Sequence, residues 1–250
     1  VPLGYGYSAG IGRFGKPIFF VGRLIASEAG EGYRLLCTGT EEVREMIAPP
    51  AMTWGNTIWI RRESLRRVLW EMIEEWRWKK PHNALSRALD SYGFTEDAQN
   101  AIEQMVEAFA EMTILHELGE RVCGEQLGSD WEEMLSAIED RATEALIRAV
   151  RDHLADCLMV LPALLAEKNQ APLHFYFATM TGIRRQLFPA LVEAYEESLI
   201  RSNASRLKQV VREGARHWLE GASQILGAYC RGAAGSGVTL SAEMSDRLKF

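Results

Sequence analysis

The sequence predicts a mainly α protein, a helical bundle of about five to six helices that follows a small Gly-rich α+β N-terminal segment. Glycines and short β-type runs dominate the first sixty residues, whereas from residue 62 onward apolar residues recur with the helical period of about 3.6. Small, polar residues fill the end of the chain. The expected organisation is therefore an N-terminal segment at 1–61, a helical bundle at 62–231 and a flexible C-terminal tail at 232–250.

The N-terminal segment contains β-type runs that glycines and prolines separate. Between the second and the third run, Glu41–Ile47 has the composition of a short helix. The expected strands are Pro17–Ile25, Tyr33–Cys37 and Thr57–Ile60.

The run from Gly10 to Lys16 matches the first seven positions of a phosphate-binding loop. That motif requires a hydroxyl residue next and a helix after it, but Pro17 takes the hydroxyl position and a strand pattern follows. No nucleotide is therefore expected.

Helices are expected through the rest of the chain, with caps and breaks at their ends. Ser129 and Glu132 have the spacing of a capping box, and Gly128 is placed to end the preceding helix. Pro162 and Pro189 predict bends, because proline lacks the N–H that a helix needs. The expected helices are Glu63–Lys79, Asn83–Tyr92, Thr95–Leu127, Asp130–Ala166, Leu173–Arg201 and Ala204–Tyr229.

Composition and charge exclude several classes of protein. The net charge is −6 without any block of Lys and Arg, so no nucleic acid is expected as a partner. No apolar run approaches about 18 residues, so no membrane span is expected. The four cysteines form no Cys-x-x-Cys pair, which favours reduced thiols and a cytoplasmic location. A homo-oligomer or a protein partner is compatible with this composition.

Two histidines lie within apolar stripes of the expected helices. At about 100° per residue, His116 falls in the middle of one stripe, with Glu120 about 40° away on the next turn. His153 is likewise central in the following helix, and Asp156 lies about 60° from it. Burying such groups costs free energy unless they are paired, so these side chains are expected to bind one another or a ligand.

The segment from Thr113 to Glu120 resembles the zinc-binding helix of the zincin metallopeptidases. In that family two histidines four residues apart bind zinc, and an intervening glutamate is the general base. The resemblance implies that His116 is the first ligand and Glu117 the base, with Glu120 in the place of the second histidine. Ferritin-like di-iron proteins instead carry Glu-x-x-His pairs, and the sequence contains none.

The expected site is a non-haem iron or zinc centre for redox or hydrolytic chemistry. Iron is favoured because imidazole and carboxylate donors are mixed. The candidate metal ligands are His116, Glu120, His153, Asp156 and His174.

Helix geometry limits which of these ligands can meet. A straight hairpin that turns near Ser129 would separate His116 and His153 by about 15 Å along the bundle. The two histidines converge only if a helix breaks, for example at Gly119 or Gly124, or if another helix bridges the two levels. Otherwise they lie in separate layers.

Two other interpretations fit the same residues. The polar side chains, with Arg184, can form a structural network in a non-catalytic helical interaction module, whose partner would bind the tryptophans of the first long helix. Alternatively, the helices enclose a pocket for an organic ligand. The aromatic residues that would line such a pocket are Phe175, Tyr176, Phe177 and Trp218.

Overall fold

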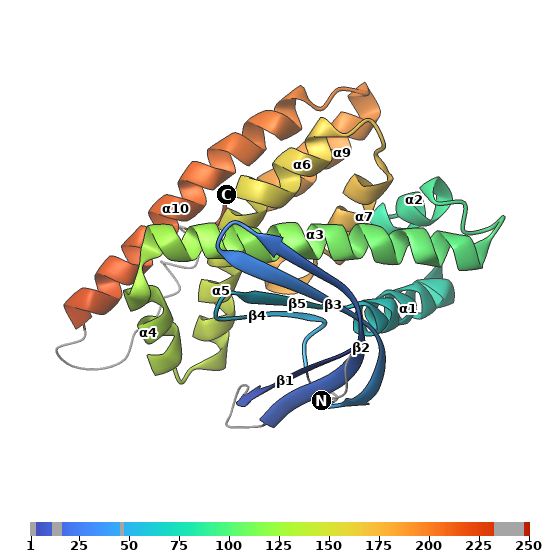
Figure 1. Ribbon diagram of the computed structural model, residues 1–250. Helices are drawn as coiled ribbons and strands as arrows, with labels where there is room; N and C mark the ends of the chain where they lie inside the picture. Colours follow the sequence, from blue (N-terminus) through green and yellow to red (C-terminus); the bar gives the residue numbers. More distant parts are fainter. Residues whose placement is uncertain (1–3, 12–16, 46–47, 233–247) are drawn as a thin grey trace. The chain divides into compact units, whose positions relative to one another are not determined.

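The computed structural model describes residues 4–11, 17–45, 48–232 and 248–250. The chain divides into two compact units, Val1–Glu117 and Leu118–Phe250. The division falls inside helix α3 (Ala98–Leu127), which is continuous across it (Figure 1).

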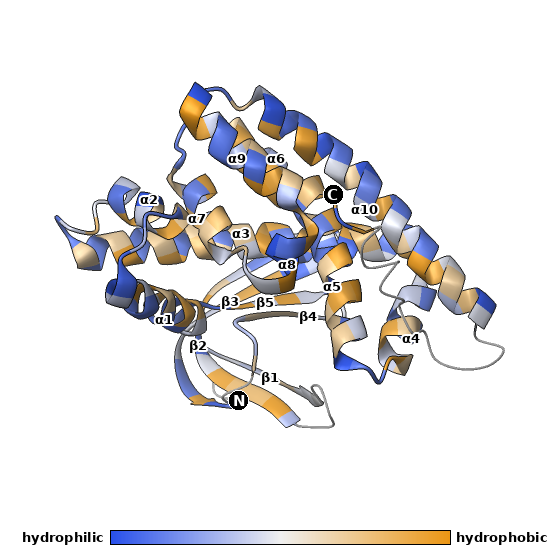
Figure 2. Cartoon of the chain, turned by 180° about the vertical axis from the view of Figure 1, so that it is seen from behind, coloured by the Kyte–Doolittle hydropathy of each residue, from blue (hydrophilic) through white to orange (hydrophobic). Residues whose placement is uncertain are grey.

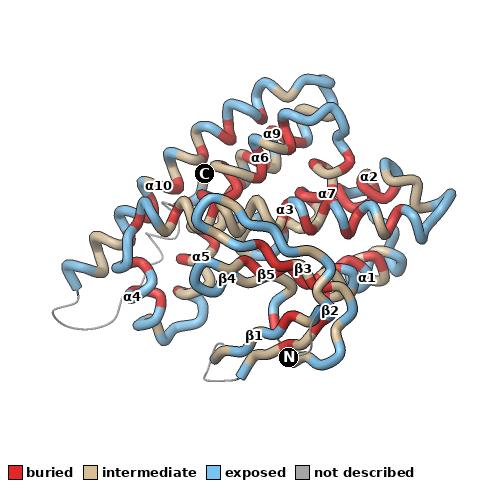
Figure 3. The backbone as a smooth tube through the Cα atoms, viewed as in Figure 1, coloured by how far each residue is buried: buried red, intermediate tan, exposed pale blue. Residues whose placement is uncertain are grey.

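The first unit is built on a mixed sheet whose described strands have the order β1-β2-β3-β5-β4. The pair β3–β5 is parallel, and the other neighbours are antiparallel. Figure 3 shows buried residues concentrated in β3 and β5, the strands in the middle of the sheet. The strands are β1 (Tyr5–Ile11), β2 (Pro17–Gly30), β3 (Tyr33–Arg44), β4 (Ala51–Trp54) and β5 (Thr57–Arg61).

The sheet curls into a half-barrel, and the residues of β1 show why. A Cβ atom on Gly6 would lie 2.6 Å from the ring of Trp59, and one on Gly10 would lie 3.0 Å from the ring of Trp54. Between them, the hydroxyl of Ser8 lies 3.9 Å from the sulfur of Met52. Alternate residues of β1 are therefore small because indole rings of β4 and β5 occupy the space in front of them.

The prediction of a small Gly-rich α+β segment is wrong, because these residues form a large curled sheet. The strands β1 and β4 were not expected, and residues 41–44 belong to β3 rather than to a short helix. Pairing of Val43 with Val21 and of Glu41 with Gly22 overrides the local helix propensity of this run. The glycine-rich start forms a strand because its small residues fit beneath aromatic rings.

The expected phosphate-loop residues connect two strands. Gly10 lies in β1 and Pro17 begins β2. Residues 12–16, which include Gly15 and Lys16, lie outside the described residues.

Three helices complete the first unit: α1 (Arg62–Lys79), α2 (Ala84–Ser91) and the first two-thirds of α3. Asn83 caps α2, since its side chain accepts a hydrogen bond of 3.0 Å from the N–H of Ser86. Ion pairs of Arg62 with Glu107 and of Arg66 with Glu103 join α1 to α3.

The second unit is helical in all of its described elements, and the expected helix Asp130–Ala166 is divided into several pieces. A short connection at 138–140 separates α4 from α5, and Asp140 caps α5 by accepting a hydrogen bond of 2.7 Å from the N–H of Thr143. The elements are α4 (Ser129–Ala137), α5 (Arg141–Ala155), the π-helical turn η2 (Asp156–Val160), α6 (Leu161–Ala166), α7 (Ala171–Thr179), α8 (Gly182–Leu187), α9 (Pro189–Arg201) and α10 (Ser205–Gly232).

Pro162 and Pro189, which were expected to bend two helices, instead lie at the start of α6 and of α9. Pro162 follows the π-helical turn, in which the N–H of Leu161 bonds to the carbonyl of Asp156 five residues earlier. In a regular α-helix the ring of Pro162 would clash with the carbonyl four residues before it. The wider turn relieves that clash. Pro189 begins α9, where its missing N–H has no intrahelical partner to lose.

The last three residues pack on the second unit. The N–H of Phe250 bonds to the carbonyl of Leu187 at 2.9 Å, and the ring of Phe250 stacks on His217 with centroids 4.7 Å apart. Residues 233–247 of the expected flexible tail lie outside the described residues. Figure 2 shows apolar and polar residues alternating along α10, so one of its faces is buried. Within the described part of the chain, no helix is long and apolar enough to cross a membrane.

Candidate metal centre

A group of three potential metal ligands lies on α3 and α5. It consists of His116, Glu120 and Asp152, each partly buried. One ligand atom from each residue can be chosen so that all of these atoms lie within 4.8 Å of one another.

Two of the three ligands are positioned by a single helix. His116 and Glu120 stand one turn apart on α3, so their side chains share a face of the helix. Because both residues lie on one continuous helix, the separation of His116 from Glu120 is set by helix geometry.

Asp152 reaches this site because α4 is a separate helix. His116 lies eleven residues before Leu127, the end of α3, and Asp152 lies eleven residues after Arg141, the start of α5. Residues 128–140 form α4 and its connections and do not extend α5. In a straight hairpin these residues would lengthen the second helix and would move Asp152 away from the level of His116. The two ligands therefore come to the same level.

Gly119 permits α3 and α5 to approach closely. A Cβ atom at this position would lie 2.6 Å from the carbonyl oxygen of Ala155, a distance that real Cβ atoms do not adopt. The neighbouring Glu120 and Asp152 lie on the two backbones that this contact joins. Glycine at 119 thus brings the carboxylates together without breaking α3.

Arg151 balances part of the negative charge at the site. Its guanidinium is 2.8 Å from a carboxylate oxygen of Glu120 and 2.8 Å from one of Glu132, and its side chain is 11% exposed. Burial lowers the pKa of Arg151, but the nearby carboxylates of Glu120 and Glu132 outweigh this effect and raise the pKa above its usual value. Arg151 therefore stays charged and holds the carboxylate of Glu120 in place.

His153 and Asp156 lie in a second, more deeply buried network. The ring of His153 is fully buried, stacks on Trp218 at 4.7 Å and has its Nε2 atom 2.9 Å from the carbonyl oxygen of Arg184. Asp156 forms an ion pair with Arg184 and accepts a hydrogen bond of 2.8 Å from the hydroxyl of Tyr176. Burial, reinforced by the charge of Asp156, raises the pKa of Tyr176 well above its usual value.

The remaining predicted residues also lie apart from the three-residue group. His174 has its Nδ1 atom 2.9 Å from the hydroxyl of Tyr195. Glu117, the base in the zincin resemblance, accepts a hydrogen bond from the hydroxyl of Thr53 within the first unit. Of the five candidate ligands, the structure thus brings His116 and Glu120 together and places His153, Asp156 and His174 elsewhere.

Sequence reasoning missed Asp152 as a ligand. The useful signal was Asp140, whose spacing from Thr143 is that of a helix N-cap. A helix that starts there takes the residues of α4 out of the hairpin, so that Asp152, eleven residues after the start of α5, comes to the level of His116, eleven residues before the end of α3.

The donor set is one imidazole nitrogen and two carboxylate oxygens. Zinc and iron(II) both accept this combination. Three protein ligands leave at least one coordination position for water or substrate, which is the arrangement of catalytic rather than structural metal sites.

The fold defines a protein of two units, one with a half-barrel sheet and one that is helical in its described elements. The three grouped residues define a candidate metal centre of one histidine and two carboxylates. Residues 66–247 match the C-terminal domain of a family of unknown function (DUF6866), and residues 1–61 match the N-terminal domain of the same family. The chain therefore belongs to the DUF6866 family. No curated protein and no solved structure matches it.

Proposed function

We propose that His116, Glu120 and Asp152 bind a divalent transition-metal ion and that the protein uses this ion for redox or hydrolytic chemistry. The observation that carries the proposal is the approach of the three ligand atoms to within 4.8 Å of one another. Ligand atoms about 2.0–2.2 Å from a zinc ion stand at most about 4.4 Å apart. Small rotations of the three side chains are enough to reach that geometry.

Iron is the expected ion and zinc the next, because the site offers one imidazole and two carboxylates and no thiolate. The described cysteine closest in sequence to Glu120 is Cys123, and burial raises its pKa to about 12. Its sulfur is fully buried and is not one of the three grouped ligand atoms.

The groups around the three ligands are consistent with a bound metal ion that water and substrate can reach. Arg151 fixes one oxygen of Glu120, which orients the carboxylate as the outer partners of metal ligands commonly do. All three ligands are partly buried rather than enclosed. A bound ion would therefore have access to water, whose pKa it would lower.

Metal analysis of protein purified without a histidine tag tests this proposal. We expect about one iron or zinc per chain, and calorimetric titration of the metal-free protein should restore it. His116→Ala and Asp152→Asn should each weaken metal binding by tenfold or more, since each removes a donor. Circular dichroism would show that the variants remain folded.

Two control variants make the test specific. His82→Ala removes an exposed histidine from a loop, and Glu132→Gln removes the outer partner of Arg151. Both should leave the metal affinity within a few-fold of the unchanged protein. A folded protein that takes up no ion, or equal affinities for Asp152→Asn and His82→Ala, would overturn the proposal.

A second candidate function is a non-catalytic interaction module. It is favoured by the network of Asp156, Arg184 and Tyr176, in which the polar groups bind one another, and by Trp78, which is 88% exposed on α1. A partner that covers Trp78, a homo-oligomer and a cytoplasmic location all stay predictions. Two results together would support this candidate. The purified chain would bind no metal, and a partner protein that co-purifies with it would be lost from the Trp78→Ala variant.

A further inference from the structure

An open groove runs between α6 and α10 of the second unit, apart from the candidate metal centre. Its volume is about 320 Å³. Each helix contributes residues at positions i, i+3 and i+4, which is one face of an α-helix. These residues are Pro162, Leu165 and Ala166 of α6 and Lys208, Val211 and Arg212 of α10.

The groove has an apolar floor and a cationic side. Leu165 and Val211 are buried in its base, and the two prominent polar groups are the exposed side chains of Lys208 and Arg212, one helical turn apart. In the described part of the chain, no carboxylate forms an ion pair with either of them. The adjacent Glu213 accepts a hydrogen bond of 2.8 Å from Gln209.

We infer that this groove binds a small amphiphilic anion, a carboxylate on a linear hydrocarbon chain of about eight to ten carbons. The groove of about 320 Å³ is open to solvent, so it covers one side of such a chain rather than enclosing it. The hydrocarbon chain lies on Leu165 and Val211, and the carboxylate lies between Lys208 and Arg212. Apolar lining with a few convergent polar groups is typical of small-ligand sites.

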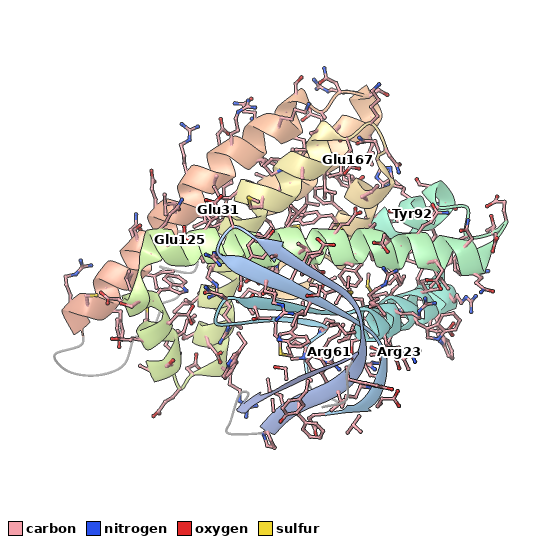
Figure 4. The ribbon with its side chains drawn as sticks, in the orientation of Figure 1. Arg23, Glu31, Arg61, Tyr92, Glu125 and Glu167 are labelled. Atoms are coloured by element: carbon pink, nitrogen blue, oxygen red, sulfur yellow. The ribbon has the colours of Figure 1, made fainter. Side chains whose placement is uncertain are left out.

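The size of the groove argues against a helical peptide as the occupant. The helix α6 has six residues, so its wall is about 9 Å long. A docking helix is about 10–12 Å across with its side chains and needs several anchor positions, whereas the buried residues of this floor are Leu165 and Val211, which suit a single hydrocarbon chain. Glu167 directly follows α6 (Figure 4) and adds negative charge at that end, which would repel an acidic segment that continued past the groove.

Calorimetric titration with decanoate, below the concentration at which it forms micelles, tests the inference. We expect saturable binding of one decanoate per chain. Decanol lacks the charge and acetate lacks the chain, so both should bind at least tenfold more weakly. The Asp152→Asn variant should bind decanoate normally, which separates this site from the candidate metal centre.

Matched variants on α10 locate the site. Lys208→Ala combined with Arg212→Ala should weaken decanoate binding about tenfold, whereas Arg206→Ala removes an exposed cation outside the groove and should change nothing. Val211→Ser should weaken decanoate and decanol alike. The inference is overturned if the double variant binds decanoate as well as Arg206→Ala does. It is also overturned if decanoate does not bind while an acidic peptide does, since the occupant is then a protein.

Discussion

Each of the two units contains a buried ion pair between an arginine and a carboxylate, and the two pairs are built differently. In the first unit Arg61 bonds to Glu41 at 2.6 Å, and neither side chain is exposed. In the second unit Arg184 pairs with Asp156, and the arginine side chain is 24% exposed. The difference lies in what else each arginine holds.

Arg61 connects an irregular segment to the sheet. It donates hydrogen bonds of 2.7 and 2.8 Å to the carbonyl oxygens of Ala48 and Pro49, and its guanidinium lies over the ring of Phe20 at 4.7 Å. Figure 4 labels Arg61 at the end of β5, among the strands of the first unit. Backbone carbonyls without strand partners are thus satisfied by one side chain.

Arg184 joins helices through side chains instead. Its ion pair connects the short helix α8 to the π-helical turn, and Tyr176 of α7 bonds to the same carboxylate. Burial lowers the pKa of Arg184, but the negative charge of Asp156 more than offsets this effect and raises it. Each carboxylate has a further partner, since Arg44 and Ser64 lie beside Glu41 as Tyr176 lies beside Asp156. The two pairs differ because Arg61 also holds two backbone carbonyls of the irregular segment.

Removal of either arginine should reduce the free energy of unfolding, and the loss at Arg61 should exceed that of the other substitutions considered below. Arg61→Met removes the main cation of the buried Glu41 carboxylate and leaves the carbonyl oxygens of Ala48 and Pro49 without this donor, which should cost about 3–5 kcal/mol of unfolding free energy. Arg184→Met should cost less, about 1–3 kcal/mol, because Tyr176 still donates to Asp156 and water can approach. Urea unfolding measures the loss, and hydrogen exchange assigns it to a unit.

A double variant checks the cause of the loss at Arg61. Replacing Glu41 by Gln in the Arg61→Met protein removes the buried negative charge that has lost its main cation and should restore part of the stability. Equal losses of unfolding free energy for Arg61→Met and Arg184→Met would show that the two ion pairs contribute equally and would contradict the expected difference.

Two glycines of α3 provide an intermediate effect within the second unit. Gly119→Ala forces a Cβ atom against the carbonyl of Ala155 and should cost about 1–3 kcal/mol. It should also weaken metal binding, because it pushes Asp152 away from Glu120. Gly124→Ala meets nothing within 4 Å and should stabilise the helix by up to about 1 kcal/mol. Thermal unfolding of both variants measures the difference, and equal midpoints would contradict the close approach.

The smallest effect at neutral pH concerns the buried thiols. Burial raises the pKa of Cys123 to about 12 from 9.0, and raises that of Cys157 well above its usual value. The folded second unit therefore keeps protons that the unfolded chain loses. This contribution to stability is fully present below pH 9 and is lost as the pH rises toward 12.

Thiol labelling provides the measurement. The exposed Cys230 should react rapidly at pH 8, whereas Cys123 and Cys157 should react only when the second unit unfolds. In the first unit, burial raises the pKa of the half-buried Cys37 to about 11, and it should react at an intermediate rate. Rapid labelling of Cys157 in the folded protein would contradict the burial on which this prediction depends.

Three long helices and several of their ends could be predicted from the amino-acid sequence, whereas the expected Asp130–Ala166 and Leu173–Arg201 are each divided into shorter helices. The expected Glu63–Lys79 corresponds to α1 and Ala204–Tyr229 to α10, within a few residues at each end, because an apolar stripe and local caps are properties of the helix itself. The sequence also singled out His116 and Glu120, since an i, i+4 pair on one face needs no knowledge of the rest of the fold.

The fold of the N-terminal glycines and the residue that completes the group around Glu120 depend on contacts between segments distant in sequence. Gly6 and Gly10 form a strand because Trp59 and Trp54, distant in sequence, lie where their side chains would be. Asp152 rather than its neighbour His153 reaches the group because the two side chains point about 100° apart on α5. Which of two adjacent residues faces a partner depends on helix register, and long-range packing fixes that register.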